Sequence, residues 1–448
     1  MVIRSFYIIF LCFWHFLIAQ ESKFTIPNGD QSVLDFQLVN NLIIIPVEVN
    51  GIELSFILDS GVSKPILFNI INMDNSFRVK ESKKIYLRGL GGNGAVEALK
   101  SNNNVFKIGD AINSNQDLFL IYDNSINFTP RLGVNVHGII GFDFLKDFVV
   151  EIKYINKRIR FYEPSNYKYK NCKKCKDSKL FLRNKKPYLD AEVTLDSMPI
   201  LVKLLVDTGS SDALWLFEDE SLGLKPYEGA FFIDFLGKGL SGDIHGKRSK
   251  ISKFNLKGFE LDNINVAYPD SLSITIARKF KERNGSIGGE LLKRFNLIID
   301  YSRSKITFKK NGNYKKPFYY NKAGIFLEQR GVRVVKQHIK KLNINDGPGI
   351  NENNAINIDK SYNYKLVPSY EIIALREDSP AVKSGLEVGD IILNVNGKES
   401  HEYGLQEVMH KFYDRTGKQM RILVNRNGNN IFFKFRLEEA FSIKKPSK

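Results

Sequence analysis

Strand-length apolar segments separated by short turns dominate the first 310 residues of the chain. The segments are rich in β-branched and aliphatic residues, and the turns contain Asn, Asp or Gly, which is the pattern of strands in a mainly β protein. Few segments show the periodicity of an amphipathic helix. Two of the apolar runs, residues 56–58 and 204–206, each lead directly into an aspartate. The pattern therefore predicts two buried strands that carry carboxylates toward the interior.

The two runs carry related motifs. The first reads Phe-Ile-Leu-Asp-Ser-Gly over residues 56–61, and the second reads Leu-Leu-Val-Asp-Thr-Gly over residues 204–209. Glycine allows the backbone to turn sharply after each aspartate. A lone buried carboxylate is costly, but two that converge can share one proton and become an acid and a base side by side. Asp59 and Asp207 are therefore the candidate catalytic residues.

The motifs belong to a longer repeat. An offset of 148 positions relates Asp59 to Asp207 and also maps the glycines at 89, 91 and 94 onto those at 237, 239 and 242. An offset one position shorter maps Gly138 onto Gly285. Both copies then continue into a strand and hairpin, with turns expected at residues 156–157 and 303–304. The repeat predicts two similar lobes whose approximate two-fold axis passes between the aspartates.

Three features of each half, taken together, resemble the pepsin-like and retropepsin-like aspartic proteases over roughly residues 30–310: the Asp-Ser/Thr-Gly turn, the glycine-rich hairpin about thirty residues later, and the late hydrophobic-hydrophobic-Gly element. The resemblance implies a mainly β, bilobal fold with pseudo-two-fold symmetry. It also implies an endopeptidase that activates water by general acid–base catalysis at Asp59 and Asp207, on protein or peptide substrates, without a cofactor or metal.

The resemblance assigns further roles residue by residue. The turn that supports the dyad would consist of Ser60, Gly61, Thr208 and Gly209, with the two hydroxyls bonding across the lobes. The flap over the substrate cleft would contain Gly89, Gly91, Gly92 and Gly94, and its counterpart at residues 237–242 is either a second flap or a vestige. Tyr86 lies before these glycines and Val62 replaces a small residue, so the chain is nearer to bacterial two-lobed retropepsin-like proteins than to pepsin.

The last third of the chain has a different character. Residues 379–397 contain Ser-Pro-Ala, Gly-Asp-Ile-Ile and Asn-Gly, and they resemble a PDZ domain of the bacterial kind, expected over residues 317–440. The resemblance places the peptide groove at Gly324, Ile325 and Phe326 and its flanking helix at residues 403–413, with a peptide ligand that adds as a strand. The Asn- and Gly-rich residues 345–363 predict a flexible insertion.

The domain boundaries follow from these segments. Residues 1–19 combine a basic residue with an apolar run and a small residue at the end, as in a secretory signal peptide, although an uncleaved anchor is an alternative. Lobe one is expected over residues 24–164, a linker over residues 165–178 and lobe two over residues 179–310. The protein is therefore expected to be secreted or periplasmic, with no stable membrane span after cleavage.

Composition narrows the remaining possibilities. The net charge is +17, but the lysines are scattered, so a nucleic-acid partner is not expected. Cys172 and Cys175 would form a local disulfide or remain two free thiols, since no second pair or nearby histidine completes a metal site. No Gly-x-Ser-x-Gly turn supports a serine protease. The main alternative is a catalytically silent protease fold that serves as a peptide-binding scaffold of the cell envelope.

Overall fold

The computed structural model describes residues 22–68, 82–123, 126–195, 198–342 and 358–440, and side chains in all of these except 338–342 and 358–361. The predicted signal segment, residues 1–19, lies outside these ranges. Within the described part of the chain, no helix has both the length and the apolar composition needed to cross a membrane.

Lobe one is built on an eight-stranded sheet in the order β2-β3-β4-β9-β5-β8-β7-β6. Its pairing is antiparallel except where β9 pairs parallel with β4, and β8 with β5. Buried side chains alternate with more exposed ones along much of the longer strands, which anchors one face in the core. The strands are β2 (Gln37–Val39), β3 (Leu42–Val49), β4 (Ile52–Leu58), β5 (Ile66–Leu67), β6 (Ser82–Leu87), β7 (Val96–Ile108), β8 (Ala111–Leu120) and β9 (Gly138–Ile140).

Lobe two repeats this topology in the order β13-β14-β15-β20-β16-β19-β18-β17. Phe56 pairs with Gly138 in lobe one, and Leu204 pairs with Gly285 in lobe two, so the repeat found in the sequence is a repeat of strand register. The expected pair of similar lobes is confirmed. The strands are β13 (Phe181–Arg183), β14 (Lys186–Thr194), β15 (Pro199–Val206), β16 (Leu214–Leu216), β17 (Phe232–Gly239), β18 (Gly242–Leu256), β19 (Phe259–Pro269) and β20 (Gly285–Ile287).

A third sheet joins the lobes, in the order β1-β11-β10-β21-β22-β12. Its central pair, β10 with β21, takes one strand from each lobe, and a shared apolar core extends through both lobes. The strands are β1 (Gln31–Asp35), β10 (Val149–Lys153), β11 (Arg158–Tyr162), β12 (Cys175–Lys179), β21 (Phe295–Asp300) and β22 (Lys305–Lys310). The expected hairpins β10–β11 and β21–β22 are present, with turns at residues 154–157 and 301–304.

The segment expected to be a linker, residues 165–178, ends in a strand rather than a free connection. Cys172 and Cys175 form a disulfide, and β12 begins at Cys175 and pairs with β22. Asp177 accepts a hydrogen bond from Thr307 and forms an ion pair with Lys305. These contacts with β22 hold the end of the segment in place. The basic composition of the segment indicates only a solvated linker.

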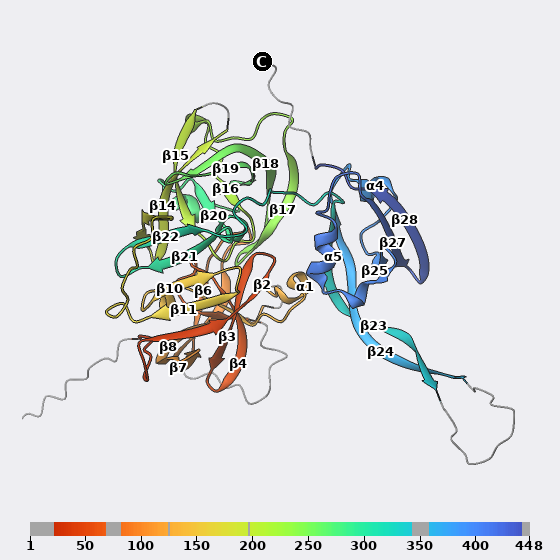
Figure 1. Ribbon diagram of the computed structural model, residues 1–448, viewed down its shortest axis with the longest axis horizontal. Coiled ribbons are helices and arrows are strands. Elements are labelled where there is room, and N and C mark those ends of the chain that lie inside the picture. The colour runs from red at the N-terminus through yellow and green to blue at the C-terminus, as the bar shows by residue number, and fades with distance from the viewer. Residues whose placement is uncertain (1–21, 69–81, 124–125, 196–197, 343–357, 441–448) are drawn as a thin grey trace, which may run out of the picture.

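The C-terminal domain has its own apolar core and lies beside the two lobes (Figure 1). Its sheet has the order β23-β24-β25-β27-β28, with β26 paired to β25. The strands are β23 (Ile325–Leu342), β24 (Ile358–Leu375), β25 (Ile391–Val395), β26 (Lys398–Glu399), β27 (Gln419–Arg426) and β28 (Asn429–Arg436). Of the insertion expected at residues 345–363, residues 345–357 lie outside the described ranges. Residues 358–363 belong to β24, which pairs with β23 in a long ribbon.

Helices are short throughout the described residues and sit at the edges of the sheets. Ser379 caps α4 through a side-chain bond to the backbone of Val382, and proline occupies the first turn of that helix. The helices are α1 (Thr129–Leu132), α2 (Phe142–Leu145), α3 (Gly289–Leu292), α4 (Pro380–Lys383) and α5 (Leu405–Lys411), with 3₁₀ turns η2 (Glu220–Leu222), η3 (Ala277–Lys279) and η4 (Ser400–Glu402).

Candidate active site

Equivalent strands deliver the two aspartates to the junction of the lobes. Asp59 follows β4, and its backbone N–H donates to the carbonyl of Ile140 at 2.8 Å. Asp207 follows β15, and its N–H donates to Ile287 at 2.9 Å. Each aspartate is therefore fixed by the parallel strand beside it, at the point where the glycine turn leaves the sheet.

Reciprocal hydrogen bonds tie the two turns together. Ser60 N–H donates to Thr208 Oγ1 at 3.0 Å, and Thr208 N–H donates to Ser60 Oγ at 3.1 Å. Each hydroxyl then donates to a carbonyl of the opposite lobe, Ser60 Oγ to Val206 at 2.6 Å and Thr208 Oγ1 to Leu58 at 2.7 Å. Both side chains are buried. The two hydroxyl residues lie where the resemblance placed them and satisfy each other's backbone.

The glycines of the turns allow the carboxylates to approach. Gly61 N–H donates to Asp59 Oδ1 at 2.7 Å, and Gly209 N–H donates to Asp207 Oδ1 at 3.1 Å. A Cβ atom on Gly209 would lie 2.2 Å from Cγ of Asp59. A side chain at this position would therefore displace one carboxyl group of the pair.

The two carboxyl groups converge beside Gly61: a Cβ atom there would lie 3.1 Å from Oδ1 of Asp59 and 3.5 Å from Oδ1 of Asp207. Burial, followed by the negative charge of Asp207, raises the pKa of Asp59 to about 7. Burial also raises the pKa of Asp207, against the opposing charges of Arg283 and Lys186. The pair therefore retains a proton well above the ordinary range of a carboxylic acid, as repulsion between two close carboxylates requires.

Two cationic side chains that lie beside the dyad were not predicted from the sequence. Lys186 begins β14, and Arg283 lies two residues before β20. Both line the cleft, and the charge of each lowers the pKa of Asp207. No local motif marks either position, because β14 and the approach to β20 meet only in the folded lobe.

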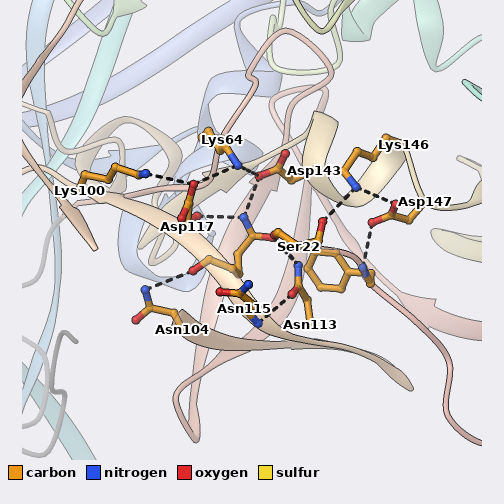
Figure 2. Close-up of polar contacts among 12 residues, drawn as sticks. Ser22, Lys64, Lys100, Asn104, Asn113, Asn115, Asp117, Asp143, Lys146 and Asp147 are labelled. Carbon is orange, nitrogen blue, oxygen red and sulfur yellow. Dashed lines mark hydrogen bonds and ion pairs between the residues drawn. The ribbon is translucent and has the colours of Figure 1, made fainter. Parts of the chain in front are cut away.

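An ion-pair network holds the segment that follows the first turn (Figure 2). Lys64 Nζ lies 3.1 Å from Oδ2 of the buried Asp143 in α2, and 3.4 Å from Asp117 at the end of β8. Gln116 donates to the same Asp143 oxygen at 2.7 Å. Asp143 thus connects the dyad turn to α2 and β8.

Two hairpins meet over the cleft. The flap glycines at residues 89–94 lie in the loop between β6 and β7, and residues 240–241 form the tip between β17 and β18. Ser241 N–H donates to Leu90 at 2.8 Å, Asn93 N–H donates to Ser241 at 2.8 Å, and Gly91 N–H donates to Ser273 at 2.9 Å. The second glycine hairpin therefore contacts the first across the cleft. The side chain of Tyr86 is exposed.

The flaps and lobes enclose a cleft of about 1350 Å³ that both aspartates line. Leu90 and Leu240 line it from the flaps, and Phe326 and Leu327 line it from the C-terminal domain. The candidate peptide groove therefore opens toward the same cleft as the dyad.

The loop before the predicted peptide groove has two backbone donors that are already engaged within the loop. Ala323 N–H and Gly324 N–H donate to Oδ1 of Asn321 at 3.1 and 2.9 Å. Gly324 has a φ of 76°, and a Cβ atom there would lie 2.3 Å from Cβ of Ser379. Ile325 and Phe326 begin β23, which is an edge strand in the described sheet and so can accept an added strand.

Helix α1 of lobe one packs at the mouth of this groove (Figure 1). Arg131 Nε donates to Glu328 of β23 at 2.8 Å, and Gln406 of α5 donates to the carbonyls of Arg131 and Leu132 at 3.2 Å. Gly133 lies against Leu405 so closely that a Cβ atom would come within 2.6 Å. The protease lobe thus contacts both walls of the candidate groove.

Two family models match parts of the chain. Residues 45–144 match a family model described as aspartyl protease, and residues 371–426 match a PDZ domain model. No curated protein matches the chain. Among solved structures, the chain is similar to the aspartic proteinase from Irpex lacteus, with 12% identity and a TM-score of 0.41, over 64% of this chain and 99% of that one.

Removal of the Thr208 hydroxyl should weaken the contact between the lobes. Thr208→Ala leaves the buried N–H of Ser60 without its acceptor, and such an orphaned group costs about 1–3 kcal/mol. Urea denaturation measures the loss. Thr208→Ser is the matched control, since it keeps the hydroxyl found at Ser60 and should remain near wild-type stability. Equal stability of the alanine and serine variants would contradict this role.

Asp143→Ala should destabilise lobe one through the network of Figure 2. It removes one of the two acceptors of the Gln116 amide and leaves Lys64 with the more exposed Asp117. Because Lys64 keeps that partner, the expected cost is that of an unsatisfied buried donor, about 1–3 kcal/mol. Thermal unfolding measures the effect. Asp117→Ala is the control and should cost less, because Asp117 is partly exposed and Asp143 would still pair with Lys64.

Proposed function

We propose that the protein is an aspartic endopeptidase in which Asp59 and Asp207 form the catalytic dyad. The observation that carries the proposal is the pair of converging carboxyl groups, held by the reciprocal Ser60–Thr208 bonds and lining one cleft. The aspartyl protease match over residues 45–144 supports a protease-type function.

The dyad can supply an acid and a base at the same moment. The ionised carboxylate accepts a proton from a water molecule as that water attacks the peptide carbonyl carbon, and the protonated carboxyl donates to the carbonyl oxygen. The two carboxyl groups hold one proton between them, and the positive charges of Arg283 and Lys186 stabilise the ionised form of Asp207. The opposite transfers then release the amine and return the dyad to its starting state.

The flaps have a role that follows from their contacts. A peptide that enters between the hairpin tips would open the bonds of Ser241 with Leu90 and Asn93, and closure of the tips over the peptide would exclude water from the reaction. We therefore expect binding of an extended peptide between the flap tips and the dyad.

The C-terminal domain would recruit substrates or partners. Strand addition at the edge of β23 needs only backbone groups and is a common peptide-binding mode of PDZ domains. The groove opens toward the dyad cleft. When one segment of a peptide binds in the groove, the rest of that peptide would therefore lie near the catalytic site. Export through the segment at residues 1–19 stays a prediction.

Asp59→Asn and Asp207→Asn should each abolish hydrolysis of a mixed peptide library, since the amide keeps the shape but cannot exchange the proton. Loss of general acid–base catalysis costs on the order of a hundredfold to ten-thousandfold in rate. The wild-type rate should fall as the pH rises above about 7, because the acid of the pair then loses its proton. Pepstatin should inhibit the wild type. Near-wild-type turnover in either variant contradicts the dyad, and a folded wild type without any hydrolysis favours the scaffold alternative.

A peptide ligand of the C-terminal domain should bind residues 317–440 alone more tightly than it binds the full chain, because α1 then no longer contacts the groove. Calorimetry with a peptide selected from an extended library measures both affinities, and Gln406→Ala in the full chain should recover part of the difference. Amidation of the peptide terminus should change affinity little, since Asn321 already occupies two loop amides. Equal affinities would exclude competition by α1, and loss of binding on amidation would show that a carboxylate displaces Asn321.

A further inference from the structure

The two halves of the cleft are not chemically equivalent, although their backbones are. Tyr188 pairs with Leu205 as Ile44 pairs with Ile57, so Tyr188 of lobe two occupies the position of Ile44 in lobe one. By the same register, Lys186 corresponds to Leu42. Lys186 pairs with Arg183 of the preceding strand, and Leu42 pairs with Val39 of the preceding strand.

A second charged position follows the same rule. Arg283 lies two residues before Gly285 and Val136 lies two residues before Gly138, and these glycines are equivalent in register. Lobe one therefore has only apolar side chains at the three positions where lobe two has Lys186, Tyr188 and Arg283. All three apolar residues, Leu42, Ile44 and Val136, are buried.

The negative charge that acts on both Lys186 and Arg283 is that of Asp207 in the dyad. Within the described residues, neither side chain forms an ion pair, and the hydrogen bonds of Arg283 go to the neutral groups of Gly285, at 3.1 Å, and Tyr188. Phe217 covers the guanidinium at 5.1 Å from its ring centre. In contrast, Arg248 at the far side of the cleft is neutralised by Asp212 at 2.8 Å and Asp234 at 2.5 Å.

The dyad cannot neutralise both cations in its active form. With one proton shared, the pair carries one negative charge against the two positive charges of Lys186 and Arg283. One cation therefore remains uncompensated in a partly buried site, where desolvated charge is costly. A carboxylate supplied by a bound peptide would offset it.

We propose that Lys186 and Arg283 form a subsite for an acidic side chain on the lobe-two side of the scissile bond, opposite an apolar subsite in lobe one that Leu42, Ile57 and Phe68 line. The preferred substrates would then carry an aspartate or glutamate at one position beside the cleaved bond and an apolar residue at the other. This inference rests on the proposed endopeptidase function.

Matched peptides test the subsite directly. Peptides that differ only in Glu or Gln at each position beside the scissile bond are compared by kcat/KM with the wild type, Lys186→Met and Lys186→Arg. Lys185→Met is the control. Lys185 directly precedes Lys186 and carries the same charge, but its side chain is exposed and lies over the ring of Phe142. Both lysine variants at 186 leave the buried Arg283 in place, so folding should be preserved.

The wild type, Lys186→Arg and Lys185→Met should prefer Glu at one position by roughly tenfold to a hundredfold, the range for one hydrogen bond to a charged group. Lys186→Met should lose most of that preference. A shift of the pH profile with an unchanged Glu-to-Gln ratio would show that Lys186 only tunes the dyad, and would overturn the proposal. The preference for Glu over Gln is also measured as the ratio of the Kd values of reduced-bond peptide analogues that carry Glu or Gln. These analogues bind without turnover. Absence of all hydrolysis then refutes the endopeptidase function, whereas a Glu preference in binding that Lys186→Met removes still supports the subsite.

Discussion

The site depends on the exchange of hydrogen bonds between Ser60 and Thr208. Each hydroxyl accepts from the backbone of the other lobe and donates to a carbonyl of that lobe, so neither turn is satisfied without its partner. Buried backbone groups without partners are costly, and the exchange therefore fixes the distance between the turns. The two carboxyl groups are carried on those turns, and their shared proton is a consequence of that spacing.

A symmetric backbone supports an asymmetric cleft. The parallel pairings of β4 with β9 and of β15 with β20 place Asp59 and Asp207 in equivalent positions, and the central sheet joins the lobes through β10 and β21. The side chains around the dyad differ between the halves, and the C-terminal domain contacts lobe one through α1. The acid–base chemistry of the dyad needs two equivalent carboxyl groups, which the symmetric backbone supplies. The unequal side chains around them can distinguish the two ends of a bound peptide.

The sequence was sufficient for the parts of the fold that repeat. The apolar runs before Asp59 and Asp207 and the glycine offsets predicted two similar lobes, and the resemblance to aspartic proteases predicted the contact of Ser60 with Thr208. Lys186 was not predicted because the hairpin of β14 and β15 is longer than that of β3 and β4: Lys186 and Leu205 are 19 positions apart, whereas their counterparts Leu42 and Ile57 are 15 apart. The offset of Leu42 is therefore 144 rather than 148 positions. The strand at Cys175, the bonds of Asn321 to the peptide loop and the docking of α1 depend on contacts between distant segments that no local pattern encodes.

The ionisation of the dyad tests its central property without relying on turnover. Carbon-13 labelling of the aspartate carboxyl groups, with Asp59→Asn and Asp207→Asn used to assign the two signals, allows their titration to be followed by NMR. The account predicts that both signals respond to two separated steps and that the pair keeps one proton until the pH reaches about 7. Independent titration of both carboxyl groups near the ordinary value of 3.8 would contradict it.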